Sequence, residues 1–217
     1  MFQNLAQLDS RLEGIIAIQG IGLSSNVYVI NGEDITLVDT GIGNEHNRLD
    51  QIFIRLQLPI QNVRQVILTH AHPDHFGGLL TIQSLSSPRI LVHKLDSDEV
   101  EGLDRNRITW IDDGDVLTTN RCRLKVIHTP GHTAGSICLF DEINKILFSG
   151  DTVFPDGLFG RTDLPTGDSS ALVNSLRKLT ILQVDSLLAG HEGPIIDDGS
   201  SHIRLSYEMA RTFFDTA

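Results

Sequence analysis

Cysteine is almost absent from this chain. Only Cys122 and Cys138 occur among 217 residues, too few for a disulfide framework or a cysteine metal motif. Each is expected to be a small buried residue, and a chain of this kind is expected in a reducing cytoplasm. The N-terminal segment, residues 1–10, also lacks the charged and then apolar pattern of a signal peptide.

Long apolar runs and an excess of basic residues are missing as well. No stretch of about 18 apolar residues occurs, so no membrane span is expected. The chain has 17 Lys and Arg against 28 Asp and Glu, a formal net charge of −11, which argues against nucleic acid as the main partner. With 40% hydrophobic and 21% charged residues, the composition is that of an ordinary globular protein.

Strand and helix patterns alternate along the chain. Strands are predicted over residues 15–18, 26–30, 35–38, 63–68, 89–93, 121–128, 136–140, 145–148 and 184–188. Helices are predicted over residues 44–58, 79–85, 96–103, 169–179 and about 200–214. Both halves show a meander followed by strand and helix, without a low-complexity linker or a sequence repeat. A single domain over residues 1–217 of α/β (α+β) class is therefore expected.

The heptapeptide THAHPDH at residues 69–75 places three imidazoles and a carboxylate directly after an apolar stretch. Zinc and similar metals take imidazole nitrogen and carboxylate oxygen as ligands. Because alternate residues of a strand share a side, His70 and His72 can converge if the extended path continues. The following proline favours a turn, behind which Asp74 and His75 can point elsewhere. The spacing predicts two ligand pairs aimed at neighbouring points, as in a dinuclear centre, with a coincidental polar loop as the alternative.

Three further ligand-type residues follow predicted strands, each directly after a glycine: His132, Asp151 and His191. Strand ends hold such residues rigidly, and loops expose them. Taken singly, each has an ordinary alternative, since a loop histidine commonly makes a structural hydrogen bond and an aspartate commonly stabilises a turn. Together with the heptapeptide, they favour a metal site built from four strand ends.

The full set, in chain order, is His70-x-His72-x-Asp74-His75, His132, Asp151 and His191. This order resembles the metallo-β-lactamase superfamily, over essentially the whole chain. The resemblance implies a four-layer αβ/βα sandwich with the site at the edge between two sheets. It also implies that His70, His72 and His132 hold one metal ion, that Asp74, His75 and His191 hold a second, and that Asp151 bridges them. The implied cofactors are two divalent ions, zinc first, with iron or manganese as alternatives.

Two further segments resemble the glyoxalase II group of that superfamily: residues 128–133, HTPGHT, and residues 159–168, FGRTDLPTGD. Members of this group are hydroxyacylglutathione hydrolases, which hydrolyse thioesters. The resemblance implies a metal-dependent hydrolase of small-molecule thioesters. The persulfide dioxygenases are close relatives that share the Gly-Arg-Thr-Asp stretch, so a mononuclear iron dioxygenase using His70, His132 and Asp151 remains open. A lactonase is a third alternative.

The chemistry of two dications also favours thioester hydrolysis. They lower the pKa of a shared water towards neutrality, and the resulting metal-bound hydroxide attacks a carbonyl that a metal ion polarises. A thiolate leaving group, with a pKa near ~8.5, departs without a strong general acid, whereas an amide nitrogen must be protonated. No extra acid stands out beside the ligands, which favours thioesters or esters over peptides. Asp74 is a candidate for orienting the hydroxide.

Asp39 and Arg161 are candidates for supporting roles. Asp39 can hydrogen-bond a ligating histidine, or it can form a turn before Gly41. Arg161 can anchor a carboxylate of the substrate, because a guanidinium suits planar anions, or it can pair with Asp163 or Asp156. Both interpretations stay open for each residue.

The end of the chain departs from the familiar glyoxalase II pattern. Those enzymes carry a C-terminal helical extension whose basic residues bind glutathione, whereas this chain has room for one helix after His191. A short form without that domain is expected, and the glutathione-binding residues have no counterparts here. The thiol of the substrate is therefore left open, as are the acyl group, the metal and the oligomeric state.

Overall fold

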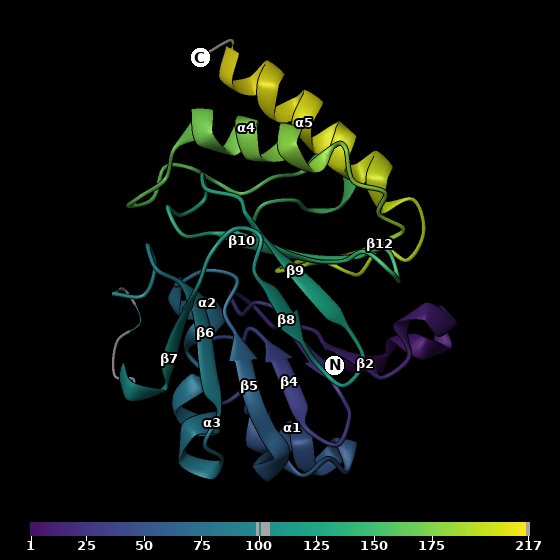
Figure 1. Cartoon of the computed structure of the whole chain (residues 1–217), viewed down its shortest axis with the longest axis vertical. Helices are drawn as coiled ribbons and strands as arrows, with labels where there is room; N and C mark the ends of the chain where they lie inside the picture. Colours follow the sequence, from purple (N-terminus) through teal and green to yellow (C-terminus); the bar gives the residue numbers. More distant parts are fainter. Residues whose placement is uncertain (99, 101–104, 216–217) are drawn as a thin grey trace.

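Four layers of secondary structure, α–β–β–α, make up the computed structural model, which describes residues 1–98, 100 and 105–215 (Figure 1). Helices α4 (Ser169–Leu179) and α5 (Gly199–Asp215) cover the outer face of one sheet. Helices α1 (Leu49–Leu56) and α3 (Leu79–Leu85) cover the outer face of the other. The four-layer αβ/βα sandwich expected from the resemblance is confirmed.

The first sheet holds, among the described residues, seven strands in chain order: β1 (Phe2–Asn4), β2 (Ile15–Ile18), β3 (Val27–Ile30), β4 (Ile35–Val38), β5 (Val63–Ile67), β6 (Arg89–His93) and β7 (Ile108–Ile111). Strands β1 to β4 form an antiparallel meander, and β4 to β7 are parallel. Because parallel strands end at the same edge of a sheet, the loops after β4, β5 and β6 emerge together.

The second sheet has the strand order β12 (Ser186–Ala189), β11 (Ile146–Gly150), β10 (Ile137–Asp141), β9 (Arg123–His128) and β8 (Val116–Thr118). Strands β11 and β12 are parallel, and the other neighbours are antiparallel. The carboxyl ends of β11 and β12 therefore lie side by side. Because β10 is antiparallel to both β9 and β11, β9 runs in the same direction as β11 and ends at the same edge.

Alternating strand side chains fill three apolar cores. Along β10, Ile137 and Leu139 face the core between the two sheets, whereas Cys138 and Phe140 face the core under α4 and α5. The third core lies between the first sheet and α1 and α3, where Phe53 is 1% exposed. Burial of such a side chain stabilises the fold by about 1.5–3 kcal/mol. Both cysteines are buried, as expected.

Several predicted boundaries shift in the structure. The helix predicted over 44–58 begins only at Leu49, because the Asn44 side chain accepts the backbone N–H of His46 and closes a turn. The strand predicted from residue 121 begins at Arg123, since the Thr119 hydroxyl accepts the backbone N–H of the residue before it. Residues 94–98 form turns, so the start of the helix predicted over 96–103 is wrong, and residues 99 and 101–103 of that prediction lie outside the described residues. Of the described helices, none is long and apolar enough to cross a membrane.

Candidate metal centre

Four loops at one edge of the sandwich bring the candidate ligands together. The segment after β5 carries His70 and His72, and it leads into α2 (Pro73–Phe76), which carries Asp74 and His75. Instead of the simple turn expected at the proline, a single helical turn forms, because proline fits the first position of a helix. The remaining candidates follow β9, β11 and β12: His132, Asp151 and His191.

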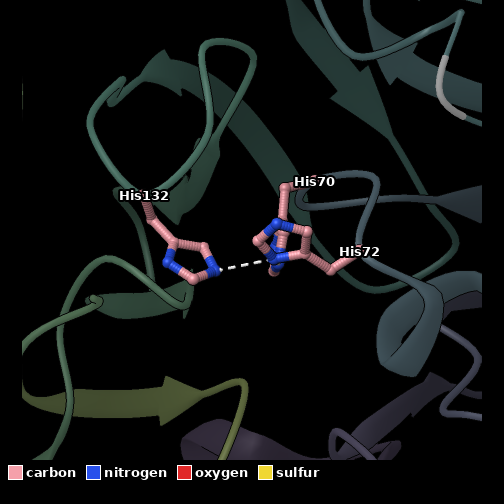
Figure 2. A group of neighbouring side chains, drawn as sticks. All are labelled: His70, His72 and His132. Atoms are coloured by element: carbon pink, nitrogen blue, oxygen red, sulfur yellow. Dashed lines mark hydrogen bonds between the residues drawn. The ribbon is translucent and has the colours of Figure 1, made fainter. Parts of the chain in front are cut away.

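His70, His72 and His132 form one group, here called the three-histidine group. His70 Nε2 lies 3.1 Å from His72 Nδ1, which lies 2.9 Å from His132 Nε2. Figure 2 shows the His132 ring approaching the other two from a separate loop. Three imidazole nitrogens at this spacing cannot all be satisfied by one another, because a neutral imidazole has only one N–H. The arrangement suits a cation placed among three lone pairs.

Hydrogen bonds behind the rings fix which nitrogen faces this point. His132 Nδ1 donates to the Arg161 carbonyl oxygen at 2.8 Å, which leaves the Nε2 lone pair facing His72. The Thr69 hydroxyl lies 3.2 Å from His70 Nδ1 and donates its own proton to Asp39, so it can accept from His70. Such partners set the tautomer and orientation of metal-ligating histidines.

Asp74, His75 and His191 form a second group, here called the mixed group. Oδ2 of Asp74 lies 3.2 Å from His191 Nε2 and 3.8 Å from His75 Nε2. His75 is fully buried, whereas the other two side chains are 28–29% exposed. The mixed group is therefore enclosed by protein at His75 and accessible to solvent at Asp74 and His191.

Asp151 lies between the two groups. Its Oδ1 is 3.2 Å from His75 Nε2, and its Oδ2 is 3.5 Å from His191 Nε2 and 3.6 Å from His132 Nε2. A side chain at Gly190 would exclude this placement, because its Cβ would lie 2.2 Å from Asp151 Oδ1. One carboxylate thus reaches ligand atoms of both groups.

Two buried atoms at this junction, His75 Nε2 and Asp151 Oδ1, have no hydrogen-bond partner in the described part of the chain. His75 Nδ1 already faces Asp39, so in a neutral ring the Nε2 lone pair points at a carboxylate oxygen. Leaving such groups unsatisfied is costly. A cation between them removes the conflict, so the residues present fit a metal ion.

The pKa shifts of the candidate ligands also favour a bound cation. Burial, helped by the His75 and His132 imidazoles, holds the pKa of His70 well below its usual value, which keeps its lone pair available. Burial also lowers the pKa of His75, but the carboxylates of Asp151 and Asp39 outweigh it and raise that pKa well above the usual value. Burial opposes ionisation of Asp151, yet His75 and the other imidazoles lower its pKa to about 2. The site favours positive charge beside Asp151, which a divalent cation supplies.

Asp39 lies behind the mixed group and is 2% exposed. Its carboxylate accepts from His75 Nδ1, from the Thr69 N–H and from the Thr69 hydroxyl, each at 2.8 Å. Its backbone has a positive φ of 58°, and its carboxylate reaches Thr69 and His75 and does not close a turn before Gly41. Asp39 therefore orients His75 and the start of the heptapeptide together.

Replacing Asp39 with asparagine is expected to weaken metal binding by about 10-fold to 100-fold, because one carboxylate oxygen that accepts from His75 becomes an amide donor. The measurement is competition with a chromophoric chelator. Asp141→Asn is the matched control, since Asp141 is also buried but caps the turn after β10, at the strand end away from the ligands. Equal affinities in Asp39→Asn and wild type would contradict this role.

Arg161 lines the same cavity as the candidate ligands, and its guanidinium pairs with Asp163 at 2.6 Å. The pair is exposed, with the two side chains 61% and 68% accessible. Exposed pairs of this kind contribute little stability, so the guanidinium can exchange its partner for an incoming anion. The structure contains the ion pair between Arg161 and Asp163. The anchoring role stays a prediction, and it is compatible with this pair.

Asp96 was not identified from the sequence. It is 2% exposed, and its carboxylate accepts from the Ala71 N–H at 2.9 Å, the Thr133 hydroxyl at 2.8 Å and the Gly135 N–H at 2.6 Å. These bonds join the heptapeptide loop to the loop that carries His132. The two halves of the three-histidine group are therefore held by one buried carboxylate.

The remaining histidines lie elsewhere. His93 stacks on His128 with ring centroids 4.1 Å apart, and His128 Nε2 donates to the Ala134 carbonyl. His202 accepts the Asp156 N–H, and His46 is exposed. They belong to none of the metal-compatible groups found among the described residues.

The candidate ligands open onto a cavity of about 450 Å³, here called the central cavity. Its apolar rim is formed by Leu23, Ile42 and Leu164, and Leu23 is 81% exposed. The floor is formed by ligand candidates from both groups, together with Asp151. A small molecule can thus approach both groups at once.

The chain matches a known family over most of its length. The profile of the Metallo-beta-lactamase superfamily matches residues 20–191. A probable metallo-hydrolase of Methanocaldococcus jannaschii is 32% identical over 216 residues, covering 92% of this chain and 99% of that protein. A hydroxyacylglutathione hydrolase of Haemophilus influenzae is 31% identical, covering 69% and 76%. An acyl-coenzyme A thioesterase of Homo sapiens is 28% identical, covering 78% and 74%.

Some relatives are longer than the match. The similarity to a beta-lactamase-like protein 2 homolog of Caenorhabditis elegans covers 59% of that protein, at 32% identity. Among solved structures, a metallo-beta-lactamase family protein of Thermus thermophilus has a TM-score of 0.79 at 23% identity, covering 94% of this chain and 81% of that chain. A protein solved in a di-iron-bound form has a TM-score of 0.71 at 26% identity, covering 89% and 96%.

Proposed function

The chain belongs to the metallo-beta-lactamase superfamily, and on this premise we propose that it is a dinuclear metal-dependent hydrolase of small thioesters. The three-histidine group would hold one ion and the mixed group the other, with Asp151 shared between them. When bound, two dications supply an acidified water and a polarised carbonyl. The imidazole and carboxylate donors suit zinc, which we propose, and also iron and manganese.

The observation that carries this proposal is the convergence of both groups on Asp151 at the floor of one cavity. A mononuclear iron dioxygenase would use only His70, His132 and Asp151. It would leave the mixed group without a role, including His75 Nε2, a buried atom with no hydrogen-bond partner among the described residues. The complete mixed group therefore supports the hydrolase over the dioxygenase.

The side chains that line the central cavity indicate which leaving group the site can release. Among the described lining residues, every titratable side chain except Arg161 belongs to the ligand candidates. No separate acid is available there to protonate a departing amine, whereas a thiolate with a pKa near ~8.5 leaves unprotonated. This supports thioesters over amides. The relatives from Haemophilus influenzae and Homo sapiens, a hydroxyacylglutathione hydrolase and an acyl-coenzyme A thioesterase, support the same substrate class.

The chain's own residues prepare this reaction. Asp74 is partly exposed to the cavity, so its carboxylate can accept a proton of the attacking water and orient it. Asp39 and the Arg161 carbonyl hold His75 and His132 in position, so the ligand atoms need little reorganisation. The Arg161 guanidinium is placed to attract a carboxylate on the thiol part.

The test is a panel of thioesters, oxoesters and amides with one acyl group, each thioester offered with an anionic and a neutral thiol. Hydrolysis of thioesters far above amides is expected. Arg161→Ala should raise KM for the anionic thioester about 10-fold and leave the neutral one unchanged, because a charge-assisted hydrogen bond is lost. Arg177→Ala, an exposed position on α4 outside the cavity lining, is the charge-matched control. Faster amide than thioester hydrolysis would refute the proposal, and equal KM changes for both thiols would refute the anchoring role.

A further inference from the structure

A second cavity adjoins the candidate metal centre. It measures about 330 Å³, is here called the side cavity, and shares His72 and Pro73 with the central cavity. A substrate whose scissile carbonyl lies over the ligands can therefore extend in two directions, one into each cavity. Hydrolysis divides a thioester at this point into an acyl part and a thiol part. The two cavities match the two parts in number and position.

The side cavity has apolar walls. These are formed by Ala71, Pro73, Phe76 and Pro165. Phe76 ends α2, one residue after His75, and packs partly into the core under the first sheet, which fixes the position of its ring. An apolar chain placed against these walls gains affinity with each methylene that it buries, about fourfold per methylene.

The polar groups of the side cavity disfavour an anion. Asp96 lies in its lining, and the described lining residues include no lysine or arginine. The hydroxyl of Thr133 is already donated to Asp96, and Thr166 Oγ1 accepts the Ala134 N–H. A carboxylate deep in this cavity would meet the like charge of Asp96 without a lysine or arginine of the described lining to offset it.

The central cavity, in contrast, favours an anion. It is the larger of the two, it is lined by Arg161, and its rim at Leu23 is exposed. A bulky thiol that carries carboxylates or phosphates has both room and a counter-charge on this side. The charge difference between the cavities therefore orients the substrate.

We propose that the side cavity binds the acyl group of the substrate, and that this group is short and uncharged. The inference rests on the proposed thioester hydrolysis and adds to it the orientation and the acyl class. Phe76 is then the residue that sets the acyl length, while the thiol part lies over the central cavity beside Arg161.

The experiment measures kcat/KM for acetyl, butanoyl, hexanoyl and succinyl thioesters of one thiol in wild type, Phe76→Trp and Phe76→Ala. For wild type, butanoyl should exceed acetyl by about 16-fold, from two buried methylenes, and succinyl should fall well below butanoyl. Phe76→Trp should cut the butanoyl-to-acetyl ratio about 10-fold, and Phe76→Ala should shift the optimum to hexanoyl. Ratios within one variant cancel any loss common to all substrates.

Binding of ketone analogues, in which a methylene replaces the sulfur, gives a second readout by calorimetry. Their Kd values should follow the same order of acyl lengths in each variant. Phe213→Trp and Phe213→Ala are matched controls, because Phe213 lies on α5 and lines neither cavity. Unchanged acyl ratios in both Phe76 variants would overturn the inference, as would succinyl thioesters hydrolysed as fast as butanoyl ones by wild type. If the inference fails in this way but wild type still hydrolyses thioesters, only the assignment of the side cavity is wrong and the proposed function is kept. If wild type hydrolyses no thioester, the proposed function and the inference are both wrong.

Discussion

Replacing His132 with alanine is expected to remove bound metal and hydrolysis together while the fold persists. His132 Nε2 is the contribution of the second sheet to the three-histidine group, 2.9 Å from His72 Nδ1. Without it, two imidazoles from one loop remain, too few for a stable site. Metal ions stabilise the charge that develops in the transition state by several kcal/mol, so kcat/KM should fall on the order of 10³-fold. His72→Ala, which removes the central nitrogen of the group, should behave alike.

Metal content, activity and circular dichroism of the same sample test this expectation. The fold should persist because His132 contributes one hydrogen bond to it, worth about 1 kcal/mol. His46→Ala is the control, since the His46 side chain is 66% exposed and belongs to no group. Near wild-type activity in His132→Ala would show that the metal assignment is wrong.

Removing metal with a chelator is expected to lower the melting temperature by about 10 °C. A ligand present at about 1,000 times its Kd stabilises the folded state by about 4 kcal/mol, and 1 kcal/mol shifts Tm by about 2–4 °C in a chain of this size. The physical cause is the junction at Asp151, where His75 Nε2 and Asp151 Oδ1 lie 3.2 Å apart and have no hydrogen-bond partner among the described residues.

Scanning calorimetry with and without chelator, followed by re-addition of zinc, measures the effect. The shift should be reversed by zinc and should be absent in a variant that lacks both His132 and His191, one residue from each group. A wild-type Tm that does not respond to chelator or zinc would contradict the assignment.

Much of the fold could be predicted from sequence periodicity because its central strands are short and mostly buried. Strands β2, β4 and β6 have the predicted bounds, as does α3. The edge strands β7 and β8 were missed, since β8 alternates exposed and half-buried residues and Trp110 of β7 is 70% exposed. Periodicity also could not arrange the layers; the resemblance supplied them.

The candidate ligands could be named from the sequence because their residue types and order are distinctive, and the fold then brings them together. The role of Asp96 could not be predicted from the sequence, because its partners are two backbone amides and a hydroxyl up to 39 positions away. Nothing in the neighbouring sequence distinguishes such a carboxylate from an exposed acidic residue. The dual role of Arg161 was also hidden, since its backbone carbonyl, which orients His132, carries no side-chain signature.

Quantifying the metal ions bound per chain, in protein that is turning over a thioester, tests the central claim most directly. The proposed centre predicts two divalent ions per chain, one for each group around Asp151, with activity that rises as the second ion binds. A single iron per chain, with oxygen consumed and no thioester hydrolysed, would contradict it and would favour the dioxygenase.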